Sequence, residues 1–99
     1  MNTKKYGIKE MVDAVGPITF GNALEAHRKC EELSAKEFAL FLGISPSSLC
    51  DLEKGRSIPS PKRAANIGRK LGEPEGYWIQ LAIQDMLRVA NLDYKVSIA

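Results

Sequence analysis

The chain has 99 residues, of which 44% are hydrophobic and 26% are charged, and its net charge is +2. These values are ordinary for one folded globular domain with a modest core, and they exclude a disordered or low-complexity chain. No apolar stretch approaches the roughly 20 residues of a membrane-spanning helix, and the N-terminus lacks the apolar segment of a secretory signal. We therefore expect a cytoplasmic protein with no membrane partner.

The first third of the chain contains two expected helices. Residues 8–15 place four apolar side chains at helical spacing, which predicts one short amphipathic helix. Thr19 is a preferred N-cap residue, and the helix that follows it is expected to reach about Leu33. His27 lies on the apolar face of that helix, and we interpret it as a packed core residue.

The next two expected helices are short and closely spaced. Ser34 and Glu37 have the spacing of a capping box, in which each side chain bonds the other residue's backbone amide. Gly43 can turn left-handed and end that helix, while Ser45 and Pro46 form the start signal of the next. Their shared core is expected from six apolar residues: Leu33, Phe38, Leu42, Ile44, Leu49 and Leu52.

Two further helices are expected in the last third. Ser60 and Pro61 start a fourth helix of the main body, and Gly72 ends it. Pro74 opens a fifth and longer helix that reaches about Ala90. The tail behind it alternates apolar and polar residues, which is typical of a strand, and an unpaired strand can join a partner's sheet edge.

Apolar residues of this C-terminal part are the candidates for a dimer or partner contact. On the fifth helix they extend beyond one face, so they either cover the fourth helix or meet a second chain, and we favour the second interpretation. The candidates are Tyr77, Trp78, Leu81, Tyr94, Val96 and Ile98.

The pair of short helices is the most informative part of the sequence. Only Gly43, Ile44 and Ser45 join them, so the helices must cross steeply, and Ala39 is small enough for the close contact. Such a pair presents its second helix outward, where its N-terminal residues can enter a major groove about 12 Å wide. Residues 34–72 also hold seven Lys/Arg and three Asp/Glu, an excess that suits a polyanion. The pattern therefore indicates binding of double-stranded DNA.

Four motifs follow one another here: LSAKEFAxxLGIS at 33–45, LxxLEKGR at 49–56, Pro59, and IxxxLG at 67–72. Together they resemble the phage-repressor/Cro (XRE-type) family of helix-turn-helix regulators, over about residues 20–72. The resemblance implies an all-α, five-helix lambda-repressor-like DNA-binding domain with a short N-terminal extension and an extended C-terminal tail.

The resemblance also implies roles for particular side chains, with the reading helix running from Ser45 to Lys54. The base-reading candidates are Ser45, Pro46, Ser47, Ser48 and Asp51. The phosphate-contact candidates are Ser34, Lys36, Lys54, Arg56, Lys62 and Arg63. Arg28 and Glu53 match a structural ion pair that ties the first helix of the family's domain to the third.

The sequence departs from the family's usual residues at three positions. Ala35 stands where the family often has a glutamine that bonds a phosphate, and Pro46 cannot read a base edge. Asp51 can accept a hydrogen bond from a cytosine amino group, but its charge repels phosphates. We therefore expect fewer direct base contacts and more readout of DNA shape and deformability.

Catalysis and metal binding are not expected. Cys30, Cys50 and His27 form no usual zinc spacing, and two cysteines in a reducing compartment are best interpreted as plain thiols. The serines have no visible His/Asp system to activate a nucleophile. We expect no catalytic residues, no metal and no cofactor, and hence a protein that is not an enzyme.

The chain is expected to form one compact domain with three parts. Residues 1–18 are an N-terminal extension, residues 19–72 the helix-turn-helix core, and residues 73–99 a C-terminal helix and tail for dimer or partner contact. We expect a sequence-specific transcriptional regulator, a homodimeric repressor of its own or a neighbouring promoter, since one reading head recognises few base pairs. Residues 1–18 and 91–99 are available for a cognate toxin, which would make the protein an antitoxin. The alternative is a protein–protein interaction module that keeps the fold without specific DNA binding.

Overall fold

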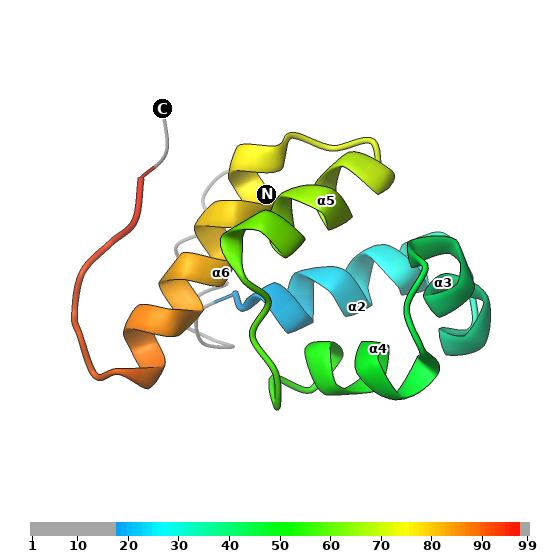
Figure 1. The fold of residues 1–99 in the computed structure, drawn as a ribbon, viewed down its shortest axis with the longest axis horizontal. Helices are drawn as coiled ribbons and strands as arrows, with labels where there is room; N and C mark the ends of the chain where they lie inside the picture. The colour runs from blue at the N-terminus through cyan, green and yellow to red at the C-terminus, as the bar shows by residue number, and fades with distance from the viewer. Residues whose placement is uncertain (1–17, 98–99) are drawn as a thin grey trace, which may run out of the picture.

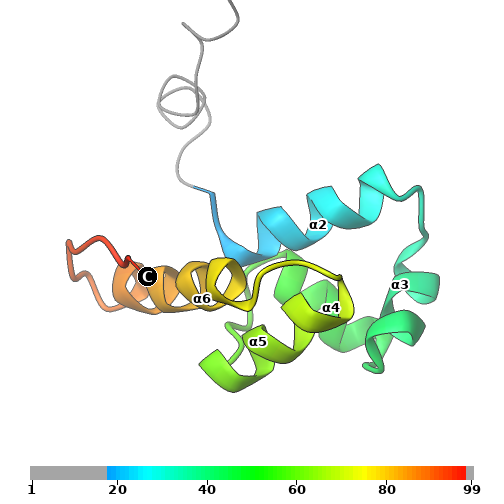
Figure 2. The ribbon, with the colours of Figure 1, turned by 90° about the horizontal axis from the view of Figure 1, so that it is seen from above.

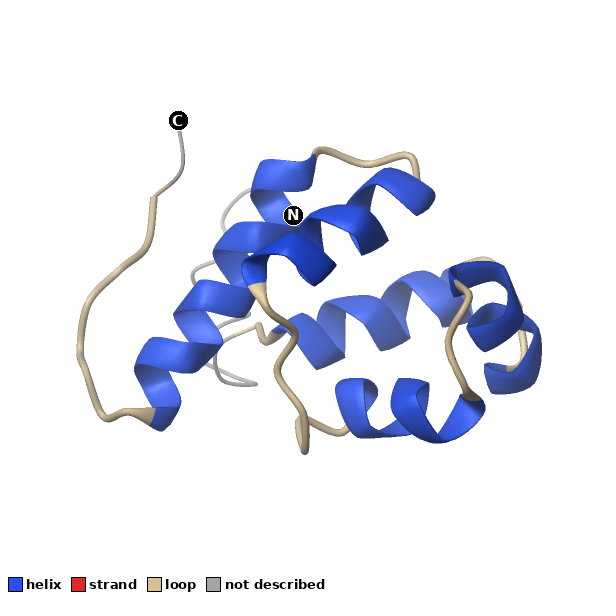
Figure 3. Ribbon diagram, viewed as in Figure 1, coloured by secondary structure: helices blue, strands red, loops and turns tan. Residues whose placement is uncertain are grey.

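The computed structural model describes residues 18–97, and these form five α-helices joined by short loops (Figure 1). The helices are α2 (Phe20–Cys30), α3 (Ala35–Leu42), α4 (Pro46–Glu53), α5 (Pro61–Lys70) and α6 (Glu75–Val89). Within residues 18–97 no strand is present (Figure 3). The all-α, five-helix prediction is therefore confirmed, while the short helix predicted over 8–15 lies outside the described residues.

Four helices begin at side-chain caps that were predicted from the sequence: Thr19, Ser34, Ser45 and Ser60. The cap of α3 is complete, because Ser34 Oγ accepts from the Glu37 amide at 3.1 Å and Glu37 Oε1 accepts from the Ser34 amide at 2.9 Å. These bonds satisfy backbone donors that the first turn of a helix leaves open. Each cap lies next to the helix it starts, so local sequence was enough to place it.

Two helix boundaries differ from the prediction. The first helix was expected to reach Leu33, but α2 ends at Cys30 because Glu32 adopts a left-handed backbone with φ 57°. The Leu33 amide then donates to the Arg28 carbonyl at 3.1 Å, which closes the helix end. At the start of α6, Pro74 is the N-cap residue and not the first helical one.

One core unites the five helices. Helix α4 packs against α2 and α3, and α6 packs against α5 and α2. Figure 1 shows α2 next to α4, and Figure 2 shows α5 and α6 side by side. The largest fully buried side chains are Trp78, Phe20, Phe38, Leu24, Leu42, Leu49 and Leu52. None of the helices described is both long and apolar enough to cross a lipid bilayer.

Trp78 lies at the centre of this core, which corrects the prediction that it contacts a partner. Its side chain is 1% exposed, its ring meets Phe20 edge to face at 5.3 Å, and its indole N–H donates to Glu73 at 3.0 Å. Gly68 of α5 makes room for it, since a Cβ there would lie 2.9 Å from the indole. Trp78 therefore joins α5 to α6 and is not available at the surface.

The buried carboxylate of Asp85 links α6 to the start of α2. Its Oδ2 accepts from the Phe20 amide at 3.0 Å, and its Oδ1 accepts from Arg88 at 2.7 Å. A negative group is favourable at a helix N-terminus, so this contact fixes α2 against α6.

The C-terminal tail is irregular chain, and the strand predicted there is wrong for residues up to 97. Gln84 of α6 holds it, donating to the Tyr94 carbonyl at 2.7 Å and accepting from the Val96 amide at 2.9 Å. These bonds use backbone groups that a strand would offer to a neighbour. Ile98 lies outside the described residues.

Candidate DNA-binding surface

The α3–α4 pair has the geometry of a helix-turn-helix. Gly43 is left-handed with φ 74°, and the Ile44 amide donates to the Ala39 carbonyl at 3.0 Å, so the chain reverses within three residues. Ala39 is fully buried where the two helices approach, and Leu49 and Leu52 anchor α4 to the core. The opposite face of α4 is consequently turned to solvent.

The first turn of α4 presents small polar side chains. Ser45 Oγ accepts from the Ser48 amide and donates to Ser48 Oγ, both at 3.0 Å, so these two serines already bond each other. Pro46 and Ser47 are exposed. Asp51, whose side chain is 45% exposed, follows Ser47 by four residues and therefore lies on the same face of the helix.

The predicted ion pair between Arg28 and Glu53 is present and nearly buried. Arg28 Nε donates to Glu53 Oε2 at 2.8 Å and Nη2 donates to Oε1 at 3.1 Å, while Nη1 donates to the Leu33 carbonyl at 3.2 Å. The Glu53 side chain is only 7% exposed, and its hydrogen bonds raise the pKa of Arg28 above the ordinary value. This planar fork ties the end of α4 to the end of α2, which sets the direction of α4.

Gly21 is a second determinant of that direction, and it was not predicted from the sequence. A Cβ at this position would lie 2.3 Å from the Leu52 carbonyl oxygen and 2.7 Å from that of Glu53. Only glycine lets α2 approach the backbone of α4 so closely. The sequence does show a glycine inside a helical pattern. Because glycine lowers helix stability, its presence there indicates that close packing requires it.

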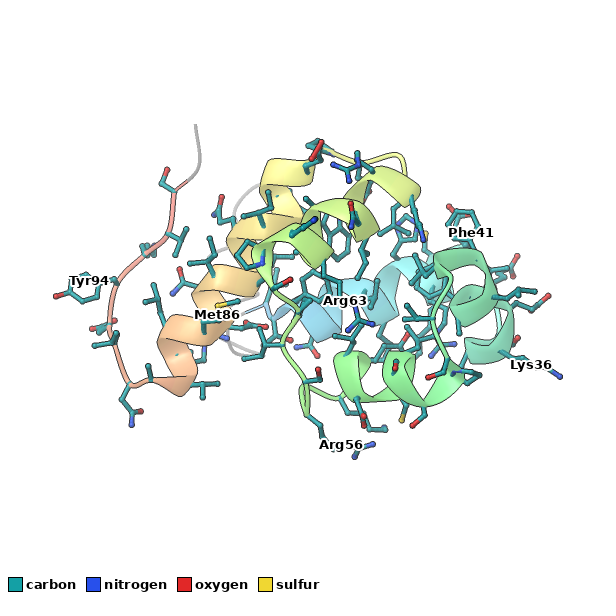
Figure 4. The ribbon with its side chains drawn as sticks, viewed as in Figure 1. Lys36, Phe41, Arg56, Arg63, Met86 and Tyr94 are labelled. Carbon is teal, nitrogen blue, oxygen red and sulfur yellow. The ribbon has the colours of Figure 1, made fainter. Side chains whose placement is uncertain are left out.

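The predicted phosphate-contact residues differ in their exposure to solvent. Lys36, Lys54 and Lys62 are exposed and Arg63 is half-buried. Figure 4 shows Arg56 projecting from the lower edge of the molecule, next to α4, and Lys36 projecting from α3 at the right-hand edge. The exposed Ser34 has its hydroxyl engaged in the cap of α3, as described above.

Arg56 is not a free cation. Its Nε donates to Asp51 Oδ1 at 3.1 Å and its Nη2 contacts the Cys50 sulfur at 3.4 Å, and the bond with Asp51 raises the pKa of Arg56. The sequence placed these residues in separate roles, one reading a base and the other gripping a phosphate. The structure brings them together.

Two large apolar side chains of α3, Leu40 and Phe41, are exposed to solvent. Leu40 is 82% and Phe41 56% exposed, and Figure 4 shows Phe41 pointing away from the side of Lys36. Beside Phe41 is a pocket of about 250 Å³ lined by His27, Glu31, Leu33, Phe38, Phe41 and Leu71. The predicted core residue His27 is only partly buried there, stacked on Phe38 with ring centroids 6.1 Å apart and 3.8 Å from Glu73.

The remaining partner candidates are spread over α6 and the tail. Tyr77 is 47% and Tyr94 69% exposed, whereas Leu81 packs against the core and Val96 is half-buried. Burial of part of its ring raises the pKa of the Tyr77 hydroxyl. Figure 4 shows Tyr94 pointing outward from the tail.

A steep helix pair with an outward second helix, held by a buried ion pair and flanked by cations, defines a helix-turn-helix domain. The model of the family described as "Helix-turn-helix" matches residues 24–78, more than half of the chain. The chain belongs to this family of XRE-type, Cro/C1-like DNA-binding transcription regulators. Neither the curated proteins nor the solved structures compared with it gave a match.

Proposed function

We propose that this protein is a sequence-specific repressor that binds duplex DNA as a homodimer through the exposed face of α4. The observation that carries the proposal is the position of Ser47 and Asp51, one helical turn apart on the solvent face of a helix whose other face is locked into the core. Groups placed this way are accessible to base edges when the exposed face of the helix lies in the major groove.

Phosphate contacts would then fix the register of the protein on DNA. Lys36 and Lys54 lie near the two ends of the helix pair, and Lys62 and Arg63 lie in the first turn of α5. Cations in these places supply affinity without sequence information, and their contribution falls as salt rises. Base selection is left to α4.

A dimer would place two copies of α4 in successive major grooves, about 34 Å apart on one side of the duplex. On α6, Tyr77 with Leu81 beside it, and on the tail Tyr94 and Val96, form our candidate contact surface. Binding over a promoter of its own or a neighbouring gene would exclude RNA polymerase sterically. Because its DNA target lies on the chromosome, we propose that the protein acts in the cytoplasm.

Hydroxyl-radical footprinting of the DNA upstream of the protein's own gene tests this proposal. We expect two protected patches about one helical turn apart, on one face of the duplex. Lys54→Ala should weaken protection of every sequence alike, and Ser47→Ala should change which sequence is protected. Protection without any preferred sequence, or identical behaviour of the two variants, would contradict the assignment of α4 as the reading helix.

The second candidate function is binding of a protein partner, which Leu40 and Phe41 favour. Leu40 is 82% and Phe41 56% exposed, and Phe41 borders a pocket that Leu33 and Leu71 also line, so a partner could bury apolar surface there. A toxin produced alongside the repressor would make the protein an antitoxin, and residues 1–18 and 91–99 are further candidate contacts. Co-expression with each protein encoded next to it, followed by copurification, tests this role, and Leu40→Lys is the matched variant that should abolish a complex formed through this patch.

A further inference from the structure

The side chains of Asp51 and Arg56 form a closed unit at the solvent edge of α4. The Arg56 amide donates to the Asp51 carbonyl at 2.9 Å, and its guanidinium Nε donates to Asp51 Oδ1 at 3.1 Å. A third contact, from Nη2 to the Cys50 sulfur at 3.4 Å, lays the guanidinium along the helix. Arg56 is therefore held to the reading helix through both its backbone and its side chain.

The pairing with Arg56 offsets the charge repulsion that Asp51 would otherwise cause on a DNA-reading face. A lone carboxylate that approaches a duplex is repelled by the phosphates on both sides of the groove. With Arg56 beside it, the pair has no net charge. Arginine has five N–H donors, and only two are used here, so the others can reach a phosphate while Nε stays on Asp51.

The carboxylate also keeps an acceptor for DNA. Within residues 18–97, Asp51 Oδ2 accepts no hydrogen bond, while Oδ1 is occupied by Arg56. In the major groove guanine presents two acceptors, and thymine presents one acceptor and a methyl group, so neither donates to a carboxylate. Cytosine and adenine each present an amino donor, but adenine also places the N7 acceptor beside it, which repels a carboxylate. The free oxygen is thus suited to cytosine.

We propose that Asp51 and Arg56 act as one base-reading unit, in which Arg56 positions and neutralises Asp51 and Asp51 Oδ2 selects a cytosine. The inference rests on the proposed function, that α4 reads duplex DNA. It changes the role of Arg56 from a general phosphate contact to a positioning residue for specificity. Lys54, two residues earlier and exposed, remains a general phosphate contact and is the matched control.

Selection of binding sites from a random duplex library, with the purified full chain, tests the unit. We expect one position of the wild-type site to require cytosine, with at least about a fivefold loss of affinity when that base pair is replaced. Asp51→Asn should move the preference at that position toward adenine, whose N6 and N7 an amide pairs with. Arg56→Ala should remove the preference there, and Lys54→Ala should weaken all sites and leave the preference intact.

Three outcomes would overturn the inference. The first is a wild-type site whose base preferences are unchanged by Asp51→Asn. The second is an Arg56→Ala variant that behaves like Lys54→Ala, with uniform weakening and the same preferred base. In these two cases α4 still reads DNA, so the proposed function stands. The third outcome, a wild-type chain that selects no sequence, would overturn the inference and the proposed function together. Far-UV circular dichroism checks that each variant is folded, which we expect because both side chains lie at the surface.

Discussion

Replacing Gly21 with alanine tests the close approach of α2 to α4. Two effects oppose each other. Alanine in a helix is favoured over glycine by about 1 kcal/mol, so at an open helical position the substitution would stabilise the protein. Here the added Cβ would lie 2.3 Å from the Leu52 carbonyl oxygen, about 1 Å inside ordinary contact, and the neighbouring atoms belong to the backbone.

We expect the steric clash to outweigh the gain in helix propensity. A backbone carbonyl cannot rotate away as a side chain can, so α2 and α4 must separate and loosen the packing of Leu49 and Leu52. Inserting a carbon into a packed site costs about 1–3 kcal/mol, and we place this site at the upper end. After the gain in helix propensity, a net loss of about 2 kcal/mol remains, or a melting temperature lower by about 10 °C.

Gly68→Ala is the matched control, because it offers the same gain in helix propensity. Its Cβ would lie 2.9 Å from the Trp78 ring, so the overlap is smaller than the one at Gly21. We expect a net loss of about 1 kcal/mol there. Thermal unfolding followed by far-UV circular dichroism measures both variants. If Gly21→Ala melts at or above the wild-type temperature, the contact between α2 and α4 is not as close as described.

Three further perturbations test other contacts. Arg28→Met leaves the nearly buried Glu53 carboxylate without its cation, so the free energy of unfolding in urea should fall by about 1–2 kcal/mol, and an unchanged value would refute the ion pair's role. The hydrogen bond from the Ser34 amide lowers the pKa of Glu37 below its ordinary 4.5. The bond therefore stabilises the fold fully above pH 4.5, and this stabilisation is lost as the pH falls through the lowered pKa. Glu37→Gln keeps the cap without titrating, and its stability should fall less steeply on acidification; identical slopes would show that the cap bond does not form in solution. Gln84→Ala should speed amide hydrogen exchange in the tail alone, and exchange that stays slow would mean that other contacts hold the tail.

The features that sequence analysis predicted well are those that neighbouring residues decide. Ser34 with Glu37, Gly43, and Ser45 with Pro46 carry their own start and stop signals, because a cap bonds backbone groups within a few residues. The resemblance added the ion pair at the far end of α4. The five helices and the outward direction of α4 follow from these signals together.

The features that were not predicted from the sequence depend on groups that are distant along the chain or on packing. The apolar face of α6 was visible, but whether Trp78 points inward depends on the space left by Gly68. Alternation in the tail is a local pattern and cannot reveal whether a partner strand exists. The pairing of Asp51 with Arg56 forms across the end of α4, where helical spacing no longer places side chains.

The central claim is that the exposed face of α4 binds specific duplex DNA, and fluorescence anisotropy tests it most directly. The full chain is titrated into the duplex from immediately upstream of its own gene and into a shuffled duplex of the same composition, at several salt concentrations. We predict binding at least about tenfold tighter to the native duplex at physiological salt, with a log–log slope near −0.9 for each phosphate contacted. Equal affinity for the two duplexes, or no binding to either, would contradict the claim and favour the protein-interaction role.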